Sequence, residues 1–418
     1  MLTNYTTDGF ENIQYQGYHA LHTIENKLNE LFKLNGYSQI ATPTFENYDM
    51  YAFEESIDSD NLFKMVNHQG RVMALKPDAT LPAARMAALS HPDPDDIIKF
   101  SYSTHIFRNF ASPEIVKKEL TQMGIEYFGN ANPDCDSSVI ALAINALQSF
   151  GIEDLHIDIG HVGFINYLFN EIDLSKAERI ELFGYFETKN IGDIHNFLEH
   201  HTIAPVIRKI ILEIPMLYGE PKDIINQMKT LCLNQDMERV VAELEAIYHH
   251  LDLLDLSKYL YFDIGFTNQM NYYSDIIFKG YVNNWGEPLL FGGRYNHLSS
   301  KFGIDRPACG FGIDLLSLMD YLEIQKCLPE EHENKIVIFY IKGDEKKSFE
   351  TATMLRSKNI IAETFELTES PESTVRHFKD KILFKNTTFY LMNHHSIYLW
   401  EDNQFNPVDQ IKEIEETA

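Results

Sequence analysis

The feature that most constrains the fold is a change of character near the middle of the chain. Between about 166 and 256 glycine becomes rare, helix-forming residues dominate, and Val240, Leu244 and Ile247 recur at helical spacing. Strand-like segments precede this block and return from about residue 259. The pattern predicts a helical insertion or subdomain that is not part of the sheet of the surrounding domain.

Two further helices are predicted before this block. Apolar residues over 18–32 recur at three- and four-residue steps, and Gly36 ends the helix in the way a left-handed cap requires. A second helix is predicted over 137–150, with Asp136 as its N-cap and Gly151 as its stop. Both helices are long enough to cover a sheet.

The predicted strands are short and are bounded by turn-forming residues. We place them at 38–42, 62–66, 72–76, 100–107, 125–128, 155–159, 259–264, 271–281 and 288–291. A turn-rich stretch and a helix near 313–324 close this part of the chain. The fold class that follows is α+β, with an antiparallel sheet flanked by helices.

The chain is expected to form two domains, because a single hydrophobic core rarely grows beyond about 250–300 residues. Residues 1–325 form the larger body, and the charged, polar segment 326–334 contains a proline and is typical of a linker. From 335 to 418 strands and helices alternate, which predicts a small α/β domain.

The charge balance weighs against a nucleic-acid partner. The chain has 35 Lys and Arg against 62 Asp and Glu, a formal net charge of −27. Proteins that bind nucleic acids usually carry a basic surface, and here even the segment 330–418 has more acids than bases. We therefore expect no tRNA partner.

The sequence predicts a cytoplasmic protein without a cofactor or a metal site. It has no apolar segment long enough to span a membrane and no recognisable leader, so no membrane partner is expected. Its cysteines are far apart, with no C-x-x-C spacing, and neither a P-loop nor a dinucleotide-binding glycine motif occurs. The histidine pairs, at 200–201, 249–250 and 394–395, lie in polar stretches and are predicted to be solvated.

Four separated stretches carry polar groups that together suit an amino acid as ligand. They are 75–80 followed by Arg85, 107–108 with 122–129, 270–273, and 291–296 with 308–313. Their acids and hydroxyl suit an ammonium, an arginine suits a carboxylate, and tyrosines suit a side chain. Each stretch alone is more often structural; Gly292-Gly293 and Gly310-Phe311-Gly312 alone indicate turns or points of close packing.

In this order the four stretches resemble the catalytic body of histidyl-tRNA synthetases, which are class II aminoacyl-tRNA synthetases. The resemblance covers about residues 8–325, and the tail more weakly resembles the anticodon-binding domain of that family. It implies the class II antiparallel sheet flanked by helices. The first helix and the segment from Gly36 to Pro43 resemble motif 1, which implies self-association as a dimer.

The resemblance also implies a histidine site. By family role, Asp78, Thr80 and Gln122 hold the ammonium, and Glu126 and Tyr273 hold the imidazole. The full set of implied histidine-binding residues is Asp78, Thr80, Arg108, Gln122, Glu126, Tyr272, Tyr273 and Tyr295.

The positions that bind ATP in the synthetases have changed. Phe110 replaces an acid in motif 2, and Asp314 and Ser317 replace the glycine and arginine of motif 3. Asn268 replaces the catalytic arginine of the histidine-specific signature. Losing one fixed charge-stabilising contact typically costs about 3–4 kcal/mol in the transition state, so losing two should abolish useful adenylation.

A body with a histidine site but without the ATP machinery resembles the regulatory subunits of ATP phosphoribosyltransferase. That resemblance implies a subunit with no catalytic residues of its own, which is required by the short catalytic subunit in the first step of histidine biosynthesis and transmits histidine feedback. It also implies a hetero-oligomer, a hetero-octamer in that family, with free histidine as regulatory ligand. The alternative is a divergent but active histidyl-tRNA synthetase; other amino-acid sensors or ligases with this body also stay open.

Overall fold

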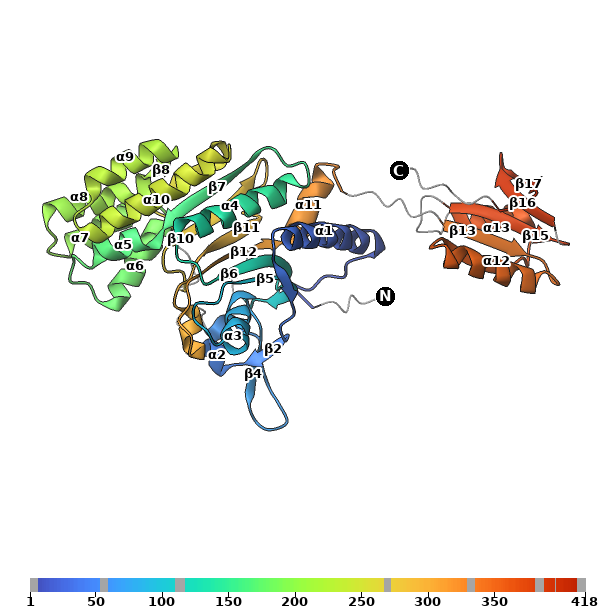
Figure 1. The fold of residues 1–418 in the computed structure, drawn as a ribbon, viewed down its shortest axis with the longest axis horizontal. Helices are drawn as coiled ribbons and strands as arrows, with labels where there is room; N and C mark the ends of the chain where they lie inside the picture. Colours follow the sequence, from blue (N-terminus) through green and yellow to red (C-terminus); the bar gives the residue numbers. More distant parts are fainter. Residues whose placement is uncertain are drawn as a thin grey trace. The chain divides into compact units, whose positions relative to one another are not determined.

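The structure is a computed structural model that describes residues 7–52, 59–109, 117–266, 272–328, 335–379, 387–394 and 396–411. The chain divides into two compact units, Met1–Leu328 and Pro329–Ala418. Figure 1 shows the first unit as a large sheet flanked by helices and the second as a smaller sheet with two helices.

The described part of the first unit contains a nine-stranded sheet, antiparallel through its middle. Parallel pairs occur toward its two ends, where β1 pairs with β5 and β7 pairs with β9. In spatial order the strands are β1 (Ser38–Ile40), β5 (Ile98–Phe107), β6 (Glu119–Phe128), β12 (Ala308–Asp314), β11 (Leu290–Arg294), β10 (Ile276–Val282), β7 (Leu155–His161), β9 (Leu260–Asp263) and β8 (Tyr218–Gly219).

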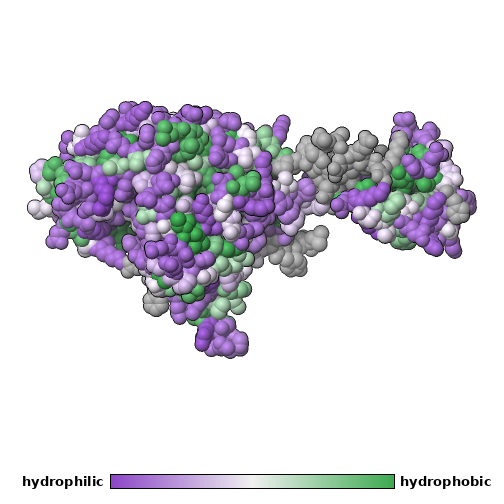
Figure 2. Space-filling model, viewed as in Figure 1, coloured by the Kyte–Doolittle hydropathy of each residue, from purple (hydrophilic) through white to green (hydrophobic). Residues whose placement is uncertain are grey.

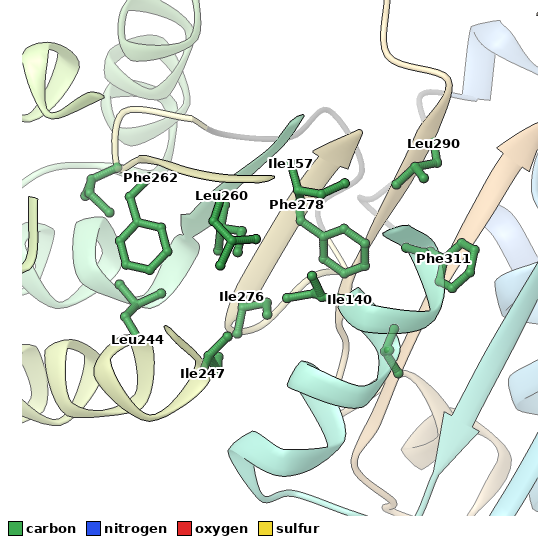
Figure 3. Close-up of a cluster of buried hydrophobic side chains, with 14 of the residues drawn as sticks. Ile140, Ile157, Leu244, Ile247, Leu260, Phe262, Ile276, Phe278, Leu290 and Phe311 are labelled. Atoms are coloured by element: carbon green, nitrogen blue, oxygen red, sulfur yellow. The ribbon is translucent and has the colours of Figure 1, made fainter. Parts of the chain in front are cut away.

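Long helices cover one face of this sheet and form the main core with it. They are α1 (Tyr15–Leu34), α4 (Pro133–Gln148), α11 (Leu315–Ile324) and α10 (Gln235–Leu253). Figure 3 shows Ile140 of α4 and Leu244 and Ile247 of α10 directed at apolar side chains of the strands, among them Ile157 and Phe278. All five side chains are buried, so this face of the sheet is fully occupied by packing.

The segment predicted to be helical is helical. It contains α5 (Val162–Phe169), α6 (Lys176–Glu187), α7 (Ile191–Glu199), α8 (Pro205–Glu213), the 3₁₀ helix η2 (Ile214–Met216), α9 (Pro221–Leu231) and α10. Strand β8 is also part of it, at the edge of the sheet beside β9. Val240, Leu244 and Ile247 are buried as their spacing predicted.

A small antiparallel sheet and a helix complete the first unit. The sheet contains β2 (Phe45–Asn47), β4 (Val72–Leu75) and β3 (Lys64–Val66), and the long helix beside it is α3 (Thr80–Ser90). The short helical turns are α2 (Asp49–Ala52), η1 (Ser59–Asn61), η3 (Ser257–Tyr259) and η4 (Leu298–Phe302). The Glu46 carboxylate, only 4% exposed, accepts hydrogen bonds from both terminal nitrogens of Arg85 and so joins β2 to α3.

The second unit is an α/β domain with its own core. Its strands, in spatial order, are β14 (Ile361–Glu366), β13 (Lys335–Tyr340), β15 (Thr387–Asn393), β16 (Ser396–Glu401) and β17 (Gln404–Val408). The first three are parallel and are connected through α12 (Glu345–Ser357) and α13 (Pro371–Lys379). The alternation of strand and helix predicted from 335 onward is therefore present, and the two final strands add an antiparallel edge.

One sequence prediction about local structure is wrong. Asp136 does not cap α4, which begins at Pro133 after Asn132; its carboxylate is buried and pairs with the Arg294 guanidinium at 2.9 Å. Of the two interpretations of Gly310-Phe311-Gly312, the structure confirms close packing: the segment is not a turn but the middle of β12, a central strand. Side chains of a neighbouring strand occupy the space above these glycines, as described below.

The class of fold and the glycine stops of the two predicted helices are confirmed. Both Gly36 and Gly151 adopt the left-handed conformation, with φ of +84° and +77°, and they lie just beyond the helices that end at Leu34 and Gln148. Within the described residues, no helix is long and apolar enough to cross a membrane. Figure 2 shows that the visible surface of the described residues is mostly hydrophilic, with scattered apolar patches.

Candidate functional site

The candidate site lies on the face of the large sheet that α4 and α10 do not cover. Side chains alternate along a strand, so Met123 and Ile125 of β6 enter the main core while Gln122, Gly124 and Glu126 face the opposite side. The predicted ligand-binding residues of β6 therefore lie on the open face.

Two buried carboxyl groups are central to the site. Glu126 is 1% exposed, and one of its oxygens accepts a hydrogen bond from the Tyr295 hydroxyl. Asp78 is 2% exposed; its Oδ1 accepts the Leu81 N–H at 2.9 Å, whereas its Oδ2 has no hydrogen-bond partner among the residues that the structure describes. An unpaired buried carboxylate oxygen is costly, so the site lacks a donor that a ligand could supply.

Tyrosine rings surround these acids. The centroids of Tyr272 and Tyr273 are 4.7 Å apart, and that of Tyr295 is 5.9 Å and 6.4 Å from them. Tyr102 of β5 belongs to the same cluster, and its hydroxyl is directed toward Gly124. The sequence reasoning missed Tyr102, although its position on a strand two residues from Phe100 placed it on this face of the sheet.

Glycines form the part of the sheet on which the site side chains lie. A Cβ atom at Gly310 would lie 2.0 Å from Glu126 Oε2, and one at Gly312 would lie 2.5 Å from Gln122 Nε2. A Cβ at Gly293 would lie 2.6 Å from the ring of Tyr273. These distances are far below van der Waals contact, so the glycines are required for the site side chains to lie flat across neighbouring strands.

The electrostatics of the site are dominated by burial. Burial raises the pKa of Glu126 to about 8, although hydrogen bonds from Tyr295 and Thr80 lower it in part, and the nearby Asp78 raises it further. Burial also raises the pKa of Asp78, against the hydrogen bond from Leu81 and the charge of Arg108. Burial therefore favours the protonated form of Glu126 in the free site, and a ligand that brings positive charge would offset the cost of ionising the two acids.

The predicted residues do not all play the part that their chemistry suggested. Arg108 donates through Nε to the Pro77 carbonyl at 3.1 Å, and its charge acts on Asp78. Gln122 lies on the same face of β6 as Glu126, four residues away, with its amide over Gly312. Arg294 does not face the site at all, because it pairs with Asp136 on the other side of the sheet.

The region that corresponds to the ATP site of the synthetases is acidic. Asp314 is the N-cap of α11: its Oδ1 accepts the backbone N–H groups of Leu316 and Ser317, and its Oδ2 accepts the Ser317 hydroxyl at 2.8 Å. Lys117, a lysine of the motif 2-like segment that the structure describes, pairs with Asp320 at 2.8 Å. Phe110 and Asn268 lie outside the described residues.

One group of side chains has the composition of a metal site but not its geometry. The ligand atoms of His161, Glu243 and Asp275 all lie within 4.8 Å of one another. However, His161 Nδ1 accepts the Gly163 N–H at 3.1 Å, so the ring proton is on Nε2, which faces Glu243 Oε2 at 3.3 Å. A hydrogen-bonded histidine–carboxylate pair fits this arrangement, and a metal bound at Nε2 does not.

The remaining polar predictions concern surface histidines. His200 is exposed, whereas His201 is partly buried, stacks on Phe197 with ring centroids 4.2 Å apart and faces Glu178 at 2.9 Å. The expectation of solvated side chains is therefore wrong for His201, which joins α6 to α7. His395 lies outside the described residues.

Comparison with known proteins finds similarity to histidyl-tRNA synthetases and to ATP phosphoribosyltransferase regulatory subunits. A family model described as Histidyl-tRNA synthetase matches residues 9–318. The ATP phosphoribosyltransferase regulatory subunit of Acetivibrio thermocellus is 33% identical over 360 residues, which is 86% of either chain. The protein of the same name from Clostridium novyi is 30% identical over 98% of this chain and 97% of its own.

A solved structure supports the same grouping. The crystal structure described as an ATP phosphoribosyltransferase regulatory subunit/histidyl-tRNA synthetase from Bacillus halodurans C is 25% identical. It covers 94% of this chain and 99% of its own, with a TM-score of 0.81.

The raised pKa of Glu126 predicts a pH-dependent stability of the first unit. Between pH 4.5 and about 8 the folded chain keeps a proton on Glu126 that the unfolded chain has lost, so the free energy of unfolding should fall as the pH rises through this window. The slope from this group can reach about 1.4 kcal/mol per pH unit. The variant Glu126→Gln should lack this contribution and be more stable than the wild type near pH 8.

Urea denaturation at several pH values, followed by Trp285 fluorescence in a Trp400→Phe background, measures the free energy of unfolding of the two proteins. If this free energy changed with pH in the same way in the wild type and in Glu126→Gln, the result would contradict the prediction.

Proposed function

The chain belongs to the family of ATP phosphoribosyltransferase regulatory subunits, and on that premise we propose that it complexes the short catalytic subunit of that enzyme and is required for its activity. In this role it acts in the first step of histidine biosynthesis and transmits feedback from free histidine. The chain itself is a regulatory subunit rather than an enzyme.

The observation that carries the proposal is that one half of a synthetase site is assembled and the other half is not. The two buried acids and the tyrosines are in place on the open face of the sheet. In contrast, Asp314 and Ser317 are engaged in capping α11, where adenylation would need cations around a triphosphate. The arrangement supports binding of an amino acid without its activation.

Histidine fits the polar groups of the site. Its ammonium would supply the donor that Asp78 Oδ2 lacks, and its imidazole can exchange a proton with Glu126 or donate to it. Thr80 and Gln122 are proposed to assist at the ammonium, and Tyr272, Tyr273 and Tyr295 to enclose the ring. Arg108 is the cation proposed for the carboxylate, and because its Nε is already engaged, we expect modest affinity.

The chain is also proposed to associate with itself as a dimer, within a hetero-octamer with the catalytic subunit, in the cytoplasm. Support for the dimer comes from two apolar side chains that are exposed in the single chain, Phe45, close to Pro43 in the sequence, at 44%, and Met65 at 46%. They lie on the sheet formed by β2, β4 and β3, close to the motif 1-like segment. Apolar strand surfaces of this kind are typical of obligate interfaces.

The first prediction from the proposed function is that the isolated chain makes no histidyl-adenylate. Histidine-dependent exchange of labelled pyrophosphate into ATP should not exceed the exchange measured without histidine, because two cation positions are lost and Asp314 adds negative charge. Robust histidine-dependent exchange would instead establish the alternative function, an active synthetase.

The second prediction concerns regulation of the assembled enzyme. The chain should co-purify with the short catalytic subunit and restore its phosphoribosyltransferase activity. Glu126→Gln and Asp78→Asn should leave basal turnover largely intact but weaken histidine inhibition by about 30-fold or more, since loss of one member of a buried charge pair costs about 2–5 kcal/mol.

The matched control is Glu119→Gln, on the same strand but at a side chain that is 35% exposed and that, within the described residues, pairs with His105. It should stay as sensitive to histidine as the wild type. Wild-type sensitivity in both site variants would place the histidine site elsewhere, for example at the contact between the subunits.

The third prediction is that the chain alone sediments as a dimer at micromolar concentration. Phe45→Asp should shift it toward monomer, because the substitution puts a carboxylate where the exposed phenylalanine would enter the apolar contact. Circular dichroism of the variant checks that the fold is retained. A wild-type chain that sediments as a monomer would contradict the proposed interface.

A further inference from the structure

A second group of charged side chains lies on the open face of the sheet, on other strands than Glu126. It contains Asp158 of β7, Asp263 of β9, Lys279 of β10 and Lys189 from the turn between α6 and α7. Figure 1 shows β7 and β10 side by side next to the helices of the insertion. We call these four residues the charged group.

Two opposite charges of this group face each other without pairing. Asp158 and Lys279 are direct partners in the register of β7 and β10, yet no ion pair joins them. The Lys279 ammonium instead lies over two aromatic rings, 4.0 Å from the centroid of Phe266 and 5.7 Å from that of Phe291. Opposite charges at such positions normally attract and pair, so this arrangement leaves both groups available.

Carboxylate oxygens of the charged group also lack hydrogen-bond donors among the described residues. Neither Asp158 Oδ1 nor Asp263 Oδ1 accepts a hydrogen bond there, although both atoms are buried and Asp263 is only 9% exposed. His156 Nε2 lies 3.8 Å from Asp158 Oδ1, beyond hydrogen-bond distance. Burial and the neighbouring Asp263 raise the pKa of Asp158 to about 6, and burial lowers the pKa of Lys279. Acceptors and a donor that are costly to leave unpaired therefore converge on one place.

The charges determine what could complete the group. Two acids and two lysines sum to zero, and the exposed Glu187 makes the surroundings slightly negative, which disfavours phosphates and nucleotides. The two lysines disfavour a metal cation. A ligand that carries both an ammonium and a carboxylate matches the free oxygens and the free ammonium at once. Aromatic rings line the same face: Tyr281 stacks on His156 at 5.2 Å, and Tyr261 lies edge-on to it.

We propose that the charged group is a second binding site, distinct from the Glu126 site, for a free α-amino acid. The ligand ammonium takes the free oxygens of Asp158 and Asp263, and its carboxylate takes Lys279. Lys189 is the resident substitute for the ligand ammonium: its Nζ is 2.8 Å from Asp263 Oδ2 and 5.0 Å from the centroid of Tyr218. Its side chain is 41% exposed, so this ion pair is weak and can be displaced.

This arrangement predicts variants with opposite effects. Lys279→Met and Asp158→Asn should weaken amino-acid binding by about tenfold or more, because each removes one charge that the ligand needs. Lys189→Gln should tighten binding, because the competing ammonium is gone. A purely structural role of the group would not give effects of opposite sign.

The test uses the full chain with the Glu126→Gln change, so that the first site does not contribute. Each of the twenty standard L-amino acids at millimolar concentration is screened for a rise in melting temperature, and isothermal titration then gives the affinity of those that act. The control is Lys99→Met, because Lys99 also lies over two rings, those of Tyr37 and Tyr127, but outside the charged group.

The expected result is at least one stabilising amino acid whose α-amide and des-amino analogues do not bind, with Lys99→Met unchanged. No stabilisation by any of the twenty, or equal affinity in the wild-type, Asp158→Asn and Lys279→Met backgrounds, would overturn the proposal. If Lys279→Met does not fold, the exposed Lys189→Gln still decides, since unchanged or weaker binding there also overturns it. Neither result depends on whether the catalytic subunit binds this chain or on where histidine acts.

Discussion

The buried ion pair between Arg294 and Asp136 is the interaction on which the arrangement of the site depends. Both side chains are 4% exposed, and Arg294 also donates to the Asn130 carbonyl at 2.9 Å and to Asn296 Oδ1 at 3.2 Å. Its own carbonyl accepts the N–H of Ser274, next to Tyr273, and the next residue, Tyr295, holds Glu126. Removing one partner of such a pair typically costs about 3–5 kcal/mol. The pair on the covered face of the sheet therefore fixes the tyrosines on the open face.

Much of this architecture could be predicted from the sequence, because its signals are local. The helical spacing of Val240, Leu244 and Ile247, and the glycine stops at Gly36 and Gly151, depend only on neighbouring residues. The role of Asp136 could not be predicted in this way, since an acid near a helix start is usually a cap. Its partner, Arg294, lies 158 residues away in the sequence. For the same reason the sequence left open whether the glycines of β12 form a turn or a point of close packing, because Gln122 and Glu126, which cover them, belong to another strand.

The candidate site shows the same division between local and distant information. The predicted histidine-binding residues that lie together in the structure are those that resemble family motifs, such as Asp78, Glu126 and Tyr295. Tyr102 has no motif, and only the pairing of β5 with β6 brings it to the cluster. The charged group around Lys279 was likewise invisible in the sequence, because four elements contribute to it and none of its residues stands in a recognisable pattern.

The replacements at Asp314 and Ser317 show how a lost function can be compatible with a more stable fold. In an adenylating enzyme, these positions must serve a polyanion, which excludes an acid there. Once that demand is absent, an aspartate can cap α11 through two backbone N–H groups, and the serine hydroxyl satisfies its second oxygen. Glu126 and Asp78 remain buried acids, and although the charge of Arg108 acts on Asp78, its Oδ2 accepts no hydrogen bond from the described residues. A ligand that pairs with these acids removes the free-energy cost of burying them, and it therefore favours the conformation in which they are buried at the site. A regulatory subunit can transmit a signal only through a difference of this kind in ligand-binding free energy between two conformations. Typical couplings of about 1–3 kcal/mol are no larger than the cost of one unsatisfied buried polar group, so the acids alone can supply the required energy.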